Sequence, residues 1–250
     1  MDYKCSNFAK IIKIKIDMTI LKKERVQMLK YLTSLIQNNN REWFQEHKED
    51  YNLMRTNLEQ LVIMLGEGLA QIKPSFKFTK SGDYTFRIYR DVRFSKDKSP
   101  YKNHIGIYLI NGGRKSPMAG YYVHIQPGES FVAGGLFRPD SKILRAVRDE
   151  IYYNHKDFGE IVLHKEFQSF FGKLWDEDKL KRVPRDFPKD SPAGEWLKFK
   201  SYIAMRSLTD ADFLGDKFIE TTLDTFRKIK PMNDFLNNAI ALSQEDNYDK

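Results

Sequence analysis

Apolar residues recur at helical spacing in the first part of the chain. From Leu21 to Ile36 they occur at intervals of three to five residues, which is typical of one face of a helix. Three asparagines follow this segment, and the last of them, Asn40, is placed to cap a second helix whose first turn carries Glu42. The same spacing predicts that this second helix continues to about Ile72.

The period then changes from that of a helix to that of a strand. Phe86 and Ile88 alternate with polar neighbours, which indicates a first strand. Turn residues separate three clearer strands, which we expect to pair as an antiparallel meander: His104–Ile110, Gly120–Gln126 and Ser130–Phe137. The short β-prone segment Ser201–Arg206 can add another strand. Within the third meander strand, Gly134 and Gly135 indicate a bulge or a close approach of backbone, either to a ligand or to a packed neighbour.

Helical spacing returns after the meander. Asp140 or Ser141 can cap a helix that begins there, and Asp157–Trp175 is predicted to form one or two shorter helices. Three prolines make Arg182–Pro192 irregular. The last part of the chain is predicted to form two helices separated by Pro231, over Asp210–Ile229 and Met232–Leu242.

A run of strands between runs of helices predicts an α+β fold. We expect an antiparallel β-meander sheet with helices before and after it packed on one face. Residues 18–250 show no break in composition and are predicted to form a single domain. Residues 1–17 are expected to be a non-native or disordered N-terminal extension, because Met18 is followed at once by a helix-like segment.

The composition is that of a globular protein. Of the 250 residues 41% are hydrophobic and 14% aromatic, which excludes a disordered or low-complexity chain. No apolar run approaches the roughly 20 residues that span a bilayer, so no membrane partner is expected. A single cysteine, Cys5, excludes an internal disulfide and favours a reducing, cytoplasmic location. The net charge of +8 favours anionic partners.

The alternation of the meander strands divides their side chains between two faces. Ile105, Ile107 and Leu109 point to one face, so His104, Gly106 and Tyr108 point to the other. On the next strand the polar set consists of Tyr122, His124 and Gln126. If the apolar sets share the core, both histidines lie on one polar face, with Gly106 leaving space between them. The alternative is an ordinary solvated sheet face.

A basic segment adjoins this face. Six basic residues and two acidic ones lie between Phe86 and Lys102, a local charge of +4. The basic residues are Arg87, Arg90, Arg93, Lys96, Lys98 and Lys102. Arginine presents a planar fork of donors that matches phosphate or carboxylate oxygens, and lysine adds point charge. The alternative is that these charges pair with acids on neighbouring helices or keep a loop soluble.

The sequence lacks the signatures of several enzyme classes. It contains no Walker-type loop, no GxGxxG, no His-Glu-x-x-His and no Gly-x-Ser-x-Gly. A metal site would need His104 and His124 to converge with a carboxylate such as Asp91 or Glu129. We therefore expect neither a metal nor a cofactor.

Three segments resemble a known family: Asn38–Phe44, Phe86–Lys102 and Gly120–Gly128. They are similar to the widespread bacterial family of uncharacterised proteins called DUF2461, and the resemblance covers roughly Met18 to Ile240. It implies a shared fold and carries over no catalytic residue. Together with the charge argument, it selects the candidate ligand-binding residues Arg41, Arg87, Arg90, Asp91, Arg93, Lys98 and Lys102, and the polar sheet face adds Tyr108 and Tyr122. His104 and His124 are the candidates for proton transfer, since imidazole titrates near neutral pH.

These observations favour binding, and leave open turnover, of a phosphate-bearing or other anionic small ligand at the basic sheet face that carries histidine and tyrosine. A second hypothesis is a nucleic-acid-binding protein, in which the basic segment follows a phosphate backbone and Tyr108 or Tyr122 stacks on bases. A third is a structural role or an acidic protein partner. The sequence leaves the oligomeric state open.

Overall fold

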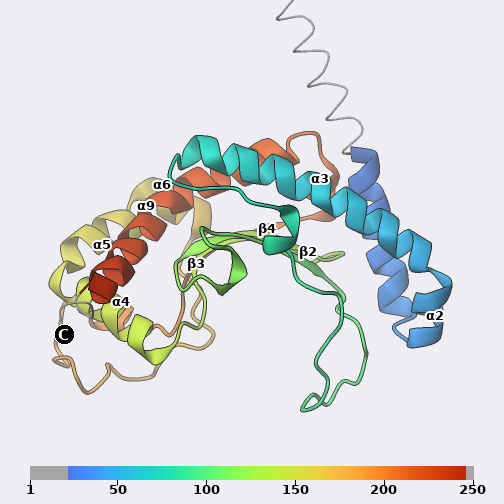
Figure 1. Cartoon of the computed structure of the whole chain (residues 1–250). Coiled ribbons are helices and arrows are strands. Elements are labelled where there is room, and N and C mark those ends of the chain that lie inside the picture. Colours follow the sequence, from blue (N-terminus) through green and yellow to red (C-terminus); the bar gives the residue numbers. More distant parts are fainter. Residues whose placement is uncertain (1–21, 246–250) are drawn as a thin grey trace, which may run out of the picture.

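Helices precede and follow a four-stranded antiparallel sheet (Figure 1). The computed structural model describes residues 22–245, so the predicted extension over residues 1–17 lies outside the described residues. The strands pair in the order β1-β2-β3-β4 and are β1 (Ile105–Leu109), β2 (Gly120–Ile125), β3 (Ser130–Leu136) and β4 (Tyr202–Leu208). The predicted α+β fold, its three-stranded meander and the added fourth strand are confirmed.

The helices before the sheet form a hairpin. Residues 22–37 are helical, and α2 (Arg41–Glu46) and α3 (Lys48–Ile72) follow. Asn40 caps α2 as predicted, because its side chain accepts a hydrogen bond of 2.9 Å from the backbone N–H of Trp43. The single helix expected over this region is two helices, since the backbone of His47 leaves the helical region at φ −106° and ψ 29°.

Among the described residues, four helices lie between β3 and β4 and two follow β4, and the first of them, α4, is capped by Asp140. They are α4 (Ser141–Tyr153), α5 (His155–Val162), α6 (Lys165–Phe171), α7 (Gly194–Leu197), α8 (Asp210–Leu214) and α9 (Phe218–Glu245). The prediction that Pro231 separates two helices is wrong, because Pro231 lies inside α9. Proline removes one hydrogen bond, but Ile229 and Met232 on either side are fully buried, and their packing holds the helix together. The break falls at Gly215 instead.

The cap of α4 supports a first prediction. We expect Asp140→Ala to lower the free energy of unfolding by about 1 kcal/mol, because the Asp140 carboxylate accepts a hydrogen bond of 2.9 Å from the backbone N–H of Ile143. Urea denaturation followed by circular dichroism measures this change. Asp140→Asn keeps an acceptor at the same place and is expected to retain most of the stability; equal losses in both variants would contradict the assignment.

The predicted first strand near Phe86 is not a strand. It touches the sheet edge at the single bridge between Thr85 and Ile107 and then leaves it. The chain instead folds back on itself, with the Lys102 N–H donating to the Ile88 carbonyl at 2.8 Å. We call residues 88–102 the arm. Alternation failed as a guide here because the arm pairs with itself rather than with a sheet.

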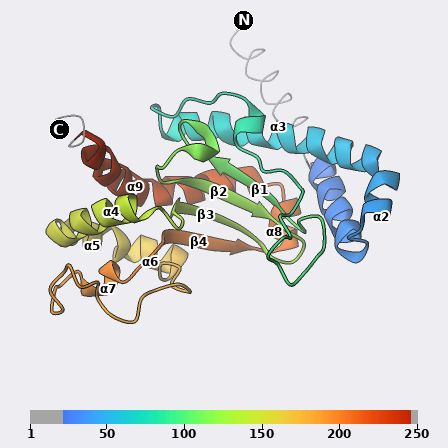
Figure 2. The ribbon, with the colours of Figure 1, turned by 60° about the horizontal axis from the view of Figure 1, so that its bottom comes forward.

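The two faces of the sheet have different surroundings. Ile107, Val123 and Val132 are fully buried on the face that α9 covers, and α3 lies beside α9 (Figures 1 and 2). An added Cβ at Gly134 would lie 2.7 Å from Ile229 of α9, so this glycine permits close helix packing rather than contact with a ligand. Figure 2 looks onto the opposite face, with both helices behind the sheet. Within residues 22–245 no helix has the length and apolar character needed to cross a bilayer.

Candidate functional site

A pocket of about 210 Å³ lies where α3, the root of the arm and the first two strands meet. The arm, the residues that flank it and the first two strands contribute most of its lining: Phe86, Arg87, Ile88, Lys102, His104, Ile105, Gly106 and Tyr122. Helix α3 contributes the remainder: Tyr51, Met54, Arg55 and Leu58. The pocket therefore combines cations, an imidazole and a phenol with an apolar wall.

Two cations lie against the ring of Phe86, and the charge of a third, Arg87, acts on one of them. The Lys102 ammonium lies 5.5 Å from the ring centroid and the Arg114 guanidinium 5.1 Å from it, while Arg87 is the next residue along the chain. Burial lowers the pKa of Lys102, and the nearby charges of Arg87 and Arg114 lower it further. Among the described residues, none of these three cations forms an ion pair with a carboxylate.

Two histidines stack beside these cations. The His104 and His124 rings are 4.4 Å apart between centroids, and the ring of Phe131 stacks on His124 at 4.6 Å. Burial lowers the pKa of His104 to about 4, and the charges of His124, Lys102 and Arg90 act in the same direction. Burial also lowers the pKa of His124. Both imidazoles are therefore neutral at pH 7.

A chain of hydrogen bonds fixes the tautomer of His124. The Tyr122 hydroxyl lies 3.1 Å from Nδ1, Nε2 lies 3.1 Å from Oε1 of Gln126, and the Gln126 amide donates to Glu129. Since the Gln126 oxygen only accepts, Nε2 carries the proton and Nδ1 accepts from the Tyr122 hydroxyl. Gly106 makes this possible, because an added Cβ there would lie 2.6 Å from the Tyr122 hydroxyl.

The tautomer of His104 is fixed in the opposite sense. Its Nδ1 lies 3.0 Å from Oδ1 of Asn103, an oxygen that only accepts, so Nδ1 carries the proton. The unprotonated nitrogen of His104 is then Nε2. His104 also lines the pocket, so this ring can accept a proton from a molecule bound there.

The predicted site residues separate into three groups: those at the pocket, those in the arm away from the pocket, and two that lie elsewhere. Arg87, Lys102, His104 and Tyr122 line the pocket, and His124 supports them through its contacts with His104 and Tyr122. Four other candidate residues lie in the arm and do not line the pocket: Arg90, Asp91, Arg93 and Lys98.

Two of the five cations of the arm pair with acids of the arm itself. Arg93 binds both carboxylate oxygens of Asp91, at 2.9 and 2.6 Å, and the pKa of Asp91 is lowered by this contact. Arg90 donates to the carboxylate of Asp97, and hydrogen bonds from Ser99 lower the pKa of Asp97. The alternative of paired charges thus holds for two of the arginines, although their partners lie in the same segment and not on neighbouring helices.

Two candidates, Tyr108 and Arg41, lie outside both the pocket and the arm. The Tyr108 hydroxyl donates to the Met118 carbonyl at 3.3 Å, and burial raises the pKa of Tyr108 to about 12. Tyr108 is on the expected sheet face, with its ring 6.4 Å from that of Tyr122. Arg41 is an exposed residue of α2, where its charge acts on Tyr101.

Sequence reasoning missed the part of the pocket that α3 forms. Tyr51, Met54 and Leu58 recur at helical spacing, so the pattern placed them on one face of the helix without showing which segment they would meet. Arg114 was also missed, because it lies outside the basic segment. It does not line the pocket itself, but it lies against the ring of Phe86, which does, and its guanidinium donates hydrogen bonds to the carbonyls of Asp83, at 3.2 Å, and Gly82, at 3.4 Å.

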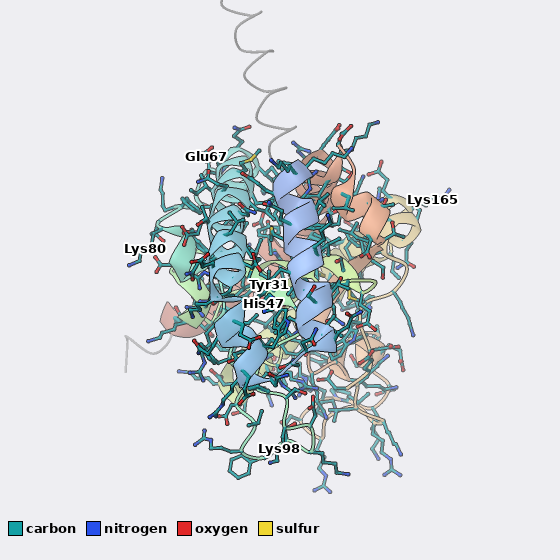
Figure 3. All side chains as sticks on the ribbon, turned by 90° about the vertical axis from the view of Figure 1, so that its right-hand side faces the viewer. Tyr31, His47, Glu67, Lys80, Lys98 and Lys165 are labelled. Atoms are coloured by element: carbon teal, nitrogen blue, oxygen red, sulfur yellow. The ribbon has the colours of Figure 1, made fainter. Side chains whose placement is uncertain are left out.

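A second pocket, of about 320 Å³, lies between the helix of residues 22–37 and the helices α2 and α3. Figure 3 looks onto these helices, with Tyr31 and His47 labelled between them. Trp43 stacks on His47 at 4.1 Å and packs against Tyr31 at 5.9 Å. Its contacts are those of an anchor between helices.

The two histidines have no carboxylate or thiolate partners for a metal ion among the described residues. Within residues 22–245 no three histidine, cysteine, aspartate or glutamate side chains come together in a group that could hold a metal ion. The two stacked imidazoles instead contact aromatic rings and amides.

Comparison with known proteins places this architecture in a family. The family model described as "Conserved hypothetical protein (DUF2461)" matches residues 27–235. No curated protein and no solved structure matches the chain. The matched range includes the whole sheet, the arm and every residue that lines the first pocket. The chain therefore belongs to the DUF2461 family.

Proposed function

We propose that this is a cytoplasmic protein that binds a small phosphate-bearing anion in the first pocket. The observation that carries the proposal is the cluster of Arg87, Lys102 and Arg114, which have no carboxylate partner among the described residues. Like charges that share a partly buried site repel one another. A bound anion would relieve this repulsion and replace it with attraction.

Three cations line the pocket, and of these Arg55 pairs with Glu59 at 3.7 Å. The other two, Arg87 and Lys102, would act in different ways. Arg87 is exposed and offers a planar fork of donors for two oxygens of a phosphate group. Lys102 is half-buried and provides a point charge at the pocket wall. Between them, the ring of Phe86 and the α3 residues Met54 and Leu58 would contact the apolar part of the ligand. The pocket therefore favours a phosphate joined to an organic group.

Proton exchange with the ligand would depend on His104. Its Nε2 holds a lone pair, and its ring stacks on His124, whose own protons are committed to the chain from Tyr122 to Gln126. An anion beside His104 would offset the charges of Lys102 and Arg90 that now lower its pKa. Binding would then bring His104 closer to neutral titration, where an imidazole serves as an acid or base.

Loss of Arg87 or Lys102 is expected to weaken anion binding at least tenfold. A charge-assisted hydrogen bond contributes about 1.5 to 3 kcal/mol, which corresponds to roughly a ten- to hundredfold change in affinity. Calorimetric titration of Arg87→Gln and Lys102→Gln with inorganic phosphate, pyrophosphate and a panel of phosphate monoesters measures the change.

The matched control is Lys165→Gln, which removes a positive charge from an exposed position on α6 (Figure 3). It is expected to bind like the unchanged protein. Absence of binding to every phosphate compound, or equal losses in Lys165→Gln and Arg87→Gln, would refute the proposed function.

A further inference from the structure

The arm is an ordered element that projects from the body of the protein. Figure 1 shows it extending away from the sheet, and Figure 3 places Lys98 at its far end. At its base Tyr89 and Tyr101 form a bridge, and one residue nearer the tip the Arg90 N–H donates to the Pro100 carbonyl at 2.9 Å. Hydrogen bonds within the arm therefore hold its two halves together.

Further contacts brace the tip. The Lys98 ammonium donates to the Val92 carbonyl at 3.0 Å, and the Asp97 carboxylate accepts from the backbone N–H of Ser99 at 2.9 Å. The pairs Arg90–Asp97 and Arg93–Asp91 cancel much of the charge inside the arm. The cations that remain without a carboxylate partner within residues 22–245 include Lys96 and Lys98 at the tip.

This bracing presents an aromatic side chain to solvent. Phe94 is 97% exposed at the tip, with the Arg93 guanidinium 5.9 Å from its ring centroid. Two more aromatic side chains are partly exposed nearer the body of the protein. Tyr89, in the arm, is 45% exposed, and Phe86, just before the arm, is 40% exposed. Exposed rings thus occur from the root of the arm to its tip, interleaved with cations.

We propose that the arm binds single-stranded nucleic acid, with Phe94 stacking on an unpaired base and Lys96 and Lys98 contacting the phosphate backbone. The charge of the arm is complementary to a polyanion, and an aromatic face offers stacking to any base. An unstacked base is available in a single strand and not in a duplex.

The distribution of the aromatics favours a linear partner over a membrane. A loop that enters a bilayer interface needs its apolar side chains at one depth, close to the surface that they enter. Here Phe94 alone is near the tip, while Tyr89 packs against Phe44 and Tyr101 at the base of the arm and Phe86 lines the pocket. A membrane would therefore gain a single ring, which anchors a loop weakly, whereas one ring is enough to stack on an unpaired base.

This inference goes beyond the proposed function and is tested separately from it. The tip residues Phe94 and Lys96 do not line the pocket. A change at the tip can therefore abolish oligonucleotide binding while the binding of inorganic phosphate stays as it was, and a pocket change can do the reverse.

Fluorescence anisotropy with a labelled single-stranded DNA oligonucleotide and its RNA counterpart tests the proposal on the full chain. We expect binding at low salt that weakens steeply as salt rises, and binding to the matched duplex that is at least fivefold weaker. Phe94→Ala is expected to weaken single-strand binding at least fivefold, and Phe94→Trp to restore it, since stacking of one base contributes about 1 to 3 kcal/mol. Lys96→Gln is expected to reduce the slope of log affinity against log salt concentration by about 1, the amount that corresponds to one phosphate contact.

The matched control for Phe94 is Phe137, another exposed phenylalanine with an arginine against its ring, since the Arg138 guanidinium lies 5.2 Å from the Phe137 centroid. Phe137→Ala is expected to bind the oligonucleotide like the unchanged protein. Three results would each overturn the proposal: no anisotropy change at low salt, equal affinity of Phe94→Ala and Phe137→Ala, or tighter binding to phosphatidylserine vesicles than to the single strand. Circular dichroism checks that both variants are folded.

Discussion

Replacing Gly135 with alanine is expected to destabilise the protein by more than about 3 kcal/mol. The added Cβ would lie 1.9 Å from the Tyr202 carbonyl oxygen, so β3 and β4 would have to separate where they pair. The φ angle of +127° at Gly135 is one that residues with side chains rarely adopt, which adds backbone strain. Urea denaturation followed by circular dichroism gives the free energy of unfolding for both proteins.

Two other glycines separate the steric effect from the backbone effect. Gly128 has a φ of +77° with no atom within 4 Å of an added Cβ, so Gly128→Ala is expected to lose only about 1 to 2 kcal/mol through backbone strain. At Gly82 an added Cβ also meets open space, without a positive φ, so Gly82→Ala is expected to change little. A loss in Gly135→Ala no larger than that in Gly128→Ala would show that the two strands are not packed as described.

The sheet could be predicted because its local and long-range requirements agree. The apolar alternation of β1 and β2 matches the observed register, in which Ile107 pairs with Val123 and Tyr108 with Tyr122. A shift of one residue would have moved the apolar set out of the core. Gly134 and Gly135 likewise signalled close backbone packing correctly, and the structure adds which neighbours approach them, Ile229 of α9 and Tyr202 of β4.

Tertiary contacts decided the elements that the pattern misplaced. Residues near Phe86 have the alternation of a strand, but the chain there pairs with its own continuation to form the arm. Pro231 is a strong local signal for a helix end, yet buried neighbours keep α9 continuous through it. In both cases the deciding contact joins residues that the local sequence pattern cannot relate to one another.

The candidate site was predicted in part, for the same reason. Strand alternation was enough to place His104, His124 and Tyr122 on one face, and the structure brings them into contact. Charge counting could not distinguish Arg87, which lines the pocket, from Arg93, which binds Asp91 two residues away. The count of charges therefore predicted that the segment is basic. It did not predict which of its cations would be free of a carboxylate partner.

His104 is expected to make stability depend on pH between about pH 6.5 and pH 4. In the unfolded chain a histidine has its ordinary pKa near 6.5, whereas burial and the charges of His124, Lys102 and Arg90 lower the pKa of His104 to about 4 in the folded protein. In this window the unfolded state binds a proton that the folded state does not, so lowering the pH favours unfolding. Below about pH 4 both states are protonated and the loss stops.

The shift corresponds to a loss of about 2 to 3 kcal/mol as pH falls from about 7.5 to 4.5. His104→Gln lacks the titrating group. Between these two pH values its free energy of unfolding should therefore fall by about 2 to 3 kcal/mol less than that of the unchanged protein. His155→Gln changes a histidine of α5 and should keep the pH dependence of the unchanged protein. Urea denaturation of the three proteins at both pH values makes the comparison. If His104→Gln lost as much stability as the others, His104 would be free to take up a proton in the folded state, which would contradict the burial of its ring beside the cations of the pocket.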